Sequence, residues 1–223
     1  MVVQSQPQLY QGVNLISKPE DLPAFQSLVS NQLEGRNSTA VWIDSGSESS
    51  TYALRSAGTQ SVMDKVHIGR AFTPFQHHTL VHSLEEFVKE NTEILVLPSI
   101  DLLYLDGQVR EWEAEELFEE VWQKVLKTAD EYDLKVLVSF SSKSTSLLQH
   151  ARKDVEREIS IGATQEGWKY DSSGFKQNAY SNGGSVQTTV SHWMQRASDA
   201  VQASVEVKRR HGYNKLHIQE SRR

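Results

Sequence analysis

The chain has 223 residues, no cysteine and a formal net charge of −6 at pH 7. This length suffices for one large α/β domain, which buries roughly 70% of the surface that its unfolded chain exposes. The lack of cysteine excludes disulfides, thiol nucleophiles and zinc sites built on cysteine. The weak negative charge has the wrong sign for a protein that binds nucleic acid over its whole surface, although it is compatible with a local basic patch.

The chain opens with MVVQSQPQLYQGV, which has neither the basic nor the apolar region of a secretion signal. No run of about 18 apolar residues occurs anywhere in the sequence. We therefore expect a cytoplasmic protein without membrane contact. Residues 1–11 are predicted to be a flexible lead-in, 12–205 a single domain and 206–223 a basic C-terminal tail.

Short apolar runs alternate with amphipathic segments along most of the chain. Strands are predicted at 13–17, 39–44, 66–68, 94–97 and 135–140, and helices at 24–34, 51–57, 77–91 and 111–132. The predicted buried stripe of the 77–91 helix consists of Leu80, Val81, Leu84, Phe87 and Val88. Acidic residues dominate the start of the 111–132 helix and are expected to form a solvated face, while Trp122 packs into the core.

The run at 94–97, ILVL, is continuously apolar, as expected of a strand buried on both faces of a parallel sheet. From residue 157 the pattern alternates, which predicts antiparallel strands with turns at 171–174 and 182–184. The predicted fold class is therefore α/β, a three-layer αβα sandwich whose mostly parallel central sheet has an antiparallel C-terminal extension. We expect VNLIS, TAVWID, EILVL and KVLVSF to run side by side in this sheet.

Four segments between residues 39 and 142 resemble the ATPase core of the RecA/RadA recombinase family, in the family's order and at its spacing. VWIDSG is similar to the YIDTEG of archaeal RadA and its eukaryotic relatives, and GRAFTPFQHHTLVHSL is similar to ARA(F/Y)NxDHQ. EILVLPSIDLLY resembles LLIVDSATALYR, and LKTADEYDLKVLVSFSS resembles LADEFGVAVVITNQV. This resemblance implies a RecA-like fold of the P-loop NTPase superfamily, in an archaeal-type paralogue.

The residues with which that family binds and hydrolyses ATP are replaced. The loop at 18–25 contains no glycine and no Gly-Lys-Thr, so it does not provide a phosphate cradle. Gly46 stands at the position of the general-base Glu, and Pro98 at that of the Walker B Asp. Loss of one such group typically costs orders of magnitude in phosphoryl transfer, so we predict a degenerate ATPase without catalytic residues or a bound cofactor. Glu48 and Asp101 are possible shifted replacements, but caps of turns or helices explain both better.

The resemblance implies a catalytically inactive interaction or regulatory module in DNA recombination or repair. The implied partners are a RecA/RadA-type recombinase, a second copy of the chain, or DNA. One alternative is a small-ligand-binding or enzymatic domain that uses the carboxyl edge of the sheet, with Arg70, Asp44, Ser99 and Lys143. Another alternative is a self-assembling structural protein.

Basic residues that are candidates for DNA or partner contact fall in three places. One follows a predicted strand, several lie in the loop 141–153 that corresponds to the family's second DNA-binding loop, and the rest lie in the tail. The candidates are Arg70, Lys143, Arg152, Lys153, Lys208, Arg209 and Arg210. For Arg70 an ion pair with a nearby carboxylate is the favoured interpretation. The tail is equally compatible with binding of phosphate backbones and with a solubilising role.

Four histidines, His67, His77, His78 and His82, lie close together in the sequence. His78 and His82 have the i, i+4 spacing that zinc accepts on a helix, but no third ligand is evident beyond His67 or Asp64. The favoured interpretation assigns His77 and His78 to the counterpart of the family's DHQ segment, and we predict no metal ligand.

Aromatic residues are a further candidate for a binding surface. Trp168 and Tyr170 flank Lys169 on a predicted strand, so they are the best candidates for exposed aromatic side chains.

Overall fold

The computed structural model of the chain describes residues 9–17, 24–45, 49, 54, 60–141, 145–164, 167–173, 175–182 and 185–188. Several predictions fall outside these residues: most of the loop at 18–25, the helix at 51–57 apart from one residue, and the C-terminal tail. The individual residues concerned are Gly46, Glu48, Lys143, Lys208, Arg209 and Arg210.

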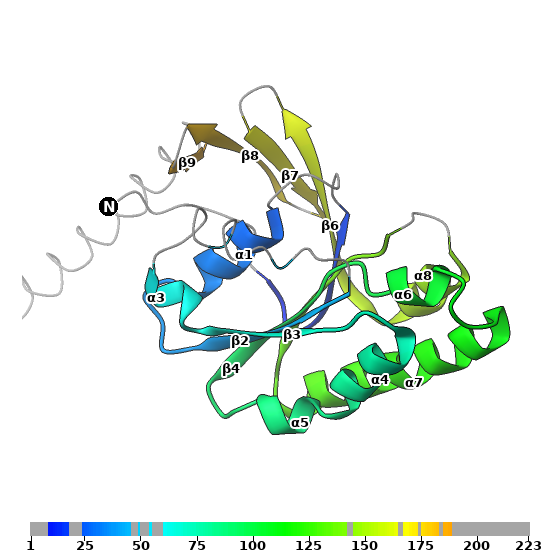
Figure 1. The fold of residues 1–223 in the computed structure, drawn as a ribbon. Helices are drawn as coiled ribbons and strands as arrows, with labels where there is room; N and C mark the ends of the chain where they lie inside the picture. Colours follow the sequence, from blue (N-terminus) through cyan, green and yellow to red (C-terminus); the bar gives the residue numbers. More distant parts are fainter. Residues whose placement is uncertain are drawn as a thin grey trace, which may run out of the picture.

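The centre of the molecule is a nine-stranded sheet with the order β3-β2-β4-β5-β1-β6-β7-β8-β9 (Figure 1). The strands are β1 (Gly12–Ser17), β2 (Thr39–Asp44), β3 (Val66–Arg70), β4 (Thr92–Leu97), β5 (Lys135–Val138), β6 (Val155–Thr164), β7 (Gly167–Ser172), β8 (Phe175–Asn182) and β9 (Ser185–Thr188). Neighbours from β3 to β6 pair in parallel, and neighbours from β6 to β9 pair antiparallel. The predicted mostly parallel sheet with an antiparallel C-terminal extension is confirmed.

The four predicted core strands lie side by side as β2, β4, β5 and β1. In β4, Ile94 and Val96 pack on one face of the sheet, whereas Leu95 and Leu97 pack on the other. All four side chains are fully buried, so the prediction of a strand covered on both faces is confirmed.

Helices cover both faces of the sheet (Figure 1). One face carries α1 (Ala24–Leu33) and α3 (Gln60–Met63), and the other carries α4 (Pro74–His82), α5 (Leu84–Phe87), α7 (Glu111–Glu131) and α8 (Ser146–Ala151). Two short helices, α6 (Leu102–Leu105) and the 3₁₀ helix η1 (Arg152–Asp154), lie in connections between strands and longer helices. Among the described residues, no helix is both long enough and apolar enough to cross a membrane.

The helix predicted at 77–91 differs from the observed structure at both ends. Helix α4 begins earlier, at Pro74, because the Thr73 hydroxyl accepts the backbone N–H of Gln76 at 3.2 Å. The helical segment is then interrupted at Ser83, and α5 ends at Phe87. Phe87 was predicted to be buried, but it is 43% exposed because the short α5 does not continue the stripe of α4.

The prediction for the aromatic residues of β7 is wrong. Trp168 and Tyr170 are 5% and 0% exposed, and they pack in the same core cluster as Phe25 and Leu28 of α1. The two aromatic residues alternate with Lys169, so they share the face of β7 that α1 covers. By contrast, the prediction that Trp122 lies in the core is confirmed, since its side chain is fully buried.

The packed part of the chain includes residues just before β1. Leu9 is buried at 2% exposure among the residues that pack on α1. Tyr10 is held by Asn14, which accepts its backbone N–H at 3.1 Å and donates to its carbonyl at 2.8 Å.

Candidate functional site

At the carboxyl edge of the central strands, where open α/β sheets usually bind ligands, the described residues form hydrogen bonds with one another. Ser45 follows β2, and its hydroxyl donates to the carbonyls of Pro98 and Ser99, each 3.0 Å away. Ser139 follows β5, and its hydroxyl accepts the backbone N–H of Ser99 at 2.9 Å. The loops after β2, β4 and β5 therefore hold one another through groups that a ligand would otherwise use.

Asp101 lies in the same region and is fully buried. It stands directly before α6 but does not cap this helix with its side chain. Its Oδ1 instead accepts the backbone N–H of Ser141, 2.6 Å away, in the loop after β5. The expected capping of the following helix is therefore not observed, and Asp101 instead joins the internal network of this edge.

Asp44 ends β2 and is the buried centre of a second small network. Its Oδ2 accepts from the Ser49 hydroxyl at 2.5 Å and from Nε of Arg70 at 3.2 Å. Arg70 also donates to the Ser49 hydroxyl at 2.9 Å. The interpretation that Arg70 pairs with a nearby carboxylate is confirmed, although 44% of its side chain remains exposed.

The described basic candidates do not form one patch. Arg70 lies at the carboxyl end of β3, whereas Arg152 and Lys153 lie in η1, directly before β6. Strands β2, β4, β5 and β1 stand between β3 and β6, and all run parallel, so the two groups are separated by these strands and lie at opposite ends of their own strands. Arg152 pairs with Glu158 at 2.7 Å, and Lys153 is exposed.

The outer edge of β3 and the adjacent α4 differ from the carboxyl edge in their exposed apolar side chains. Ile68 is 38% exposed, Phe72 is 63% exposed and Phe75 is 52% exposed. An open depression beside them is lined by Arg70, Phe75, Gln76, Thr79 and Leu80. We call this region the outer-edge surface; it consists of Ile68, Arg70, Phe72, Phe75, Gln76, Thr79 and Leu80. The sequence did not reveal it, because the order of strands decides that β3 is outermost.

The cap of α4 fixes the geometry of the outer-edge surface. Besides donating its own N–H to Thr73, Gln76 accepts the backbone N–H of Phe72 through Oε1 at 2.9 Å. This arrangement resembles a capping box, in which two orphan donors are satisfied reciprocally. Phe72 and Phe75 are thus presented from a backbone that is held in place.

The four histidines that are close in sequence separate in the structure. His77 is buried, and its Nδ1 forms a hydrogen bond with the Tyr104 hydroxyl at 2.8 Å. Burial, followed by the neighbouring His78, lowers the pKa of His77 to about 4, and burial raises the pKa of Tyr104. His67 lies exposed on β3. Neither residue joins His78 and His82.

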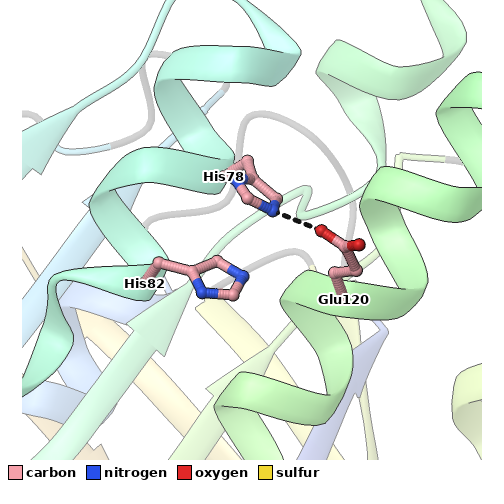
Figure 2. A group of neighbouring side chains, drawn as sticks. All are labelled: His78, His82 and Glu120. Atoms are coloured by element: carbon pink, nitrogen blue, oxygen red, sulfur yellow. Dashed lines mark hydrogen bonds and ion pairs between the residues drawn. The ribbon is translucent and has the colours of Figure 1, made fainter.

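His78 and His82 meet a carboxylate that sequence reasoning did not identify. Figure 2 shows both rings on α4 facing Glu120 of α7, with His78 Nε2 at 2.7 Å from Glu120 Oε2. Partial desolvation, then His78, lowers the pKa of His82, against an opposing effect of Glu120. No local sequence signal links Glu120 to these histidines, because only the packing of α4 on α7 brings them together.

Comparisons with known proteins do not extend this description. No protein-family model matches the chain, and no curated protein matches its sequence. The resemblance to the RecA/RadA family therefore rests on the four quoted segments and stays a prediction.

Proposed function

We propose that this chain is a RecA/RadA-like protein that does not hydrolyse ATP and acts as an interaction module in DNA recombination or repair. Its partner is a RecA/RadA-type recombinase, which it contacts through the outer-edge surface. The observation that carries the proposal is the row of exposed apolar side chains, Ile68, Phe72 and Phe75, beside an edge strand.

The carboxyl edge supports the absence of hydrolysis. Pro98 stands where the resemblance places the Mg²⁺-binding Asp, and its carbonyl already accepts from Ser45. Phosphoryl transfer depends on charged groups that are aimed at the phosphates and at the metal ion. Here the polar groups at the ends of β2, β4 and β5 bond to one another, which also disfavours a ligand-binding or enzymatic role at this edge.

An edge strand is suited to binding an extended segment of another protein. Its outer N–H and C=O groups are available to pair with an added strand, and neighbouring pockets then select alternate side chains. The depression beside Phe75 and Leu80 provides such a pocket. We therefore expect the partner to contribute an extended segment with apolar side chains at alternate positions.

The charge distribution favours a protein partner over DNA. The described basic candidates are separated by strands β2, β4, β5 and β1, and Arg70 is already paired with Asp44. The outer-edge surface itself is mainly apolar, whereas DNA interfaces are strongly positive.

The test is equilibrium binding between the purified chain and the RecA/RadA-type recombinase of the same organism. We expect the double variant Phe72→Ala/Phe75→Ala to bind at least about 10-fold more weakly, because exposed aromatic residues often dominate an interface. Tyr10→Ala is the matched control, since Tyr10 is 54% exposed beside β1, which β2, β4 and β5 separate from β3. Unchanged affinity of the double variant, or an equal loss in the control, contradicts the proposal. Sedimentation of the chain alone distinguishes a second copy as the partner.

A further inference from the structure

The face between α4 and α7 brings together three side chains of the types that bind transition metals. His78 and His82 are one helical turn apart on α4, and Glu120 faces them from α7 (Figure 2). Helix α4 packs directly on α7, so the three side chains are supported by two helices that are already in contact. This group is separate from the outer-edge surface, which uses Phe75, Gln76, Thr79 and Leu80 of the same helix.

The distances suit a single small ion. One ligand atom from each of the three residues lies within 4.8 Å of the other two. In a tetrahedral zinc site, with bonds of about 2.0–2.2 Å, ligand atoms lie about 3.3 Å apart. His82 and Glu120 are exposed and His78 is half-buried, so side-chain rotation can close this difference while both helices stay in place.

The hydrogen bond between His78 and Glu120 does not explain why the ring of His82 also lies beside these two side chains. The rings of His78 and His82 lie 4.1 Å apart between centroids and are tilted by 30°. Within the described part of the chain the His82 ring forms no hydrogen bond, although it lies beside the His78 ring and near Glu120. Two adjacent imidazoles repel when both are protonated, whereas two neutral imidazoles can share one metal ion.

A nearby lysine does not block a cation at this position. Lys124 lies one turn after Glu120 on α7, but its ammonium group pairs with Glu85 of α5. Glu85 offsets part of this positive charge, although Lys124 still contributes to lowering the pKa of His82, and the carboxylate of Glu120 stays bonded to His78 (Figure 2).

We propose that His78, His82 and Glu120 bind one divalent transition-metal ion of the zinc type. Two imidazoles and one carboxylate form a recognised ligand set for this class, whereas Mg²⁺ and Ca²⁺ prefer oxygen ligands throughout. With three protein ligands, a fourth position stays open for water or for a donor from another molecule. The ion links α4 to α7 and stabilises the layer of helices on which the outer-edge surface is built.

The experiment is a calorimetric Zn²⁺ titration of the untagged, full-length chain, with Co²⁺ absorption as a second readout and Mg²⁺ as a negative control. We expect one equivalent of Zn²⁺ to bind, Co²⁺ to give visible bands of a low-coordinate site, and Mg²⁺ to give no signal. Because the ion binds only the folded chain, saturating Zn²⁺ should raise Tm by about 5 °C or more.

The variants His82→Ala and Glu120→Gln isolate the site. Each should weaken Zn²⁺ binding at least about 100-fold, since removal of supporting groups outside the ligand set already costs up to that much. His150→Ala is the matched control, because His150 is a half-buried helical histidine that pairs with Glu119 of α7 at 2.5 Å. Histidines at positions 192, 211 and 217 remain in every variant, so their binding appears equally in all titrations.

Two results overturn the proposal. One is the absence of Zn²⁺ binding at about 100 µM metal, a concentration at which a three-ligand site should be filled. The other is binding of equal affinity and stoichiometry in the wild type, His82→Ala and Glu120→Gln, which means adventitious binding only. These results are independent of the recombinase test, because none of the three residues belongs to the outer-edge surface.

Discussion

The carboxyl edge of the central strands and the outer-edge surface differ in how their side chains are satisfied: polar side chains bond internally at the first, and apolar side chains are exposed at the second. At the carboxyl edge, Ser45, Asp101 and Ser139 form hydrogen bonds with backbone groups of neighbouring loops. At the outer-edge surface, Phe72 and Phe75 remain more than half exposed on a capped helix start. This difference is the basis for proposing that β3 and α4, rather than the carboxyl edge, bind the partner.

Helix α7 carries one fully buried tryptophan, Trp122, and one largely exposed tryptophan, Trp112. Trp122 of α7 is fully buried, stacks on Phe118 and donates Nε1–H to Asp154 at 2.9 Å. We expect Trp122→Ala to lower the free energy of unfolding by about 3–5 kcal/mol, because it leaves a large cavity. Trp112→Ala on the same helix should change it by less than about 0.5 kcal/mol. Urea unfolding of both variants checks this, and similar losses would refute the assignment of the two faces.

Stability should depend on pH through His77. Its pKa is lowered from 6.5 to about 4 by burial and, to a smaller extent, by His78. Between these values the unfolded chain binds a proton that the folded chain does not, so stability is retained above pH 6.5 and falls as the pH is lowered. We expect a loss of about 3 kcal/mol from this residue between pH 7 and pH 4.

The double variant His77→Phe/Tyr104→Phe isolates that contribution. It removes both partners of the buried hydrogen bond, so its stability at pH 7 should lie within about 1 kcal/mol of the wild type. Its unfolding free energy should fall less steeply with acid, whereas His150→Ala should keep the wild-type slope. An unchanged slope in the double variant would assign the acid sensitivity to other groups.

Disruption of the carboxyl edge should have a smaller effect. Asp101→Ala removes the acceptor of the Ser141 N–H and is expected to cost about 2 kcal/mol, the typical contribution of a hydrogen bond to a charged group. Asp106→Ala is a control, since Asp106 is an exposed carboxylate in the next loop. Equal stability of both variants would show that the internal network is not required to hold this edge.

The smallest effect on stability is expected at the outer-edge surface. Phe75→Ala should change the unfolding free energy by less than about 0.5 kcal/mol, because the side chain is 52% exposed. The same change should weaken recombinase binding, so at this residue we expect a loss of affinity without a loss of stability. A stability loss above 2 kcal/mol would instead assign Phe75 to the core.

The sequence predicted the sheet better than the surfaces. Continuous apolar runs such as 94–97 identify buried parallel strands directly, and all four core strands lie where they were expected. The alternation of Trp168, Lys169 and Tyr170 correctly indicated a strand. It did not indicate which face α1 covers, because that depends on how β6 joins the parallel and antiparallel parts of the sheet.

The candidate sites were predicted only where partners are close in the chain. The sequence predicted that Arg70 pairs with a nearby carboxylate, and the structure identifies this carboxylate as Asp44 at the end of the neighbouring strand. Glu120 meets His78 across a helix–helix contact, and the exposure of Phe72 depends on the position of β3 at the end of the sheet. Both depend on long-range packing, for which a single sequence carries no local signal.

The central claim is that the machinery for nucleotide chemistry is lost while the layered α/β scaffold remains. The most direct measurement is a titration of the purified full-length chain with ATP and Mg²⁺, in which nucleotide binding and phosphate release are followed together. We expect no phosphate release above the protein-free blank and no binding in the micromolar range. Measurable turnover, or micromolar affinity for ATP, would contradict the claim.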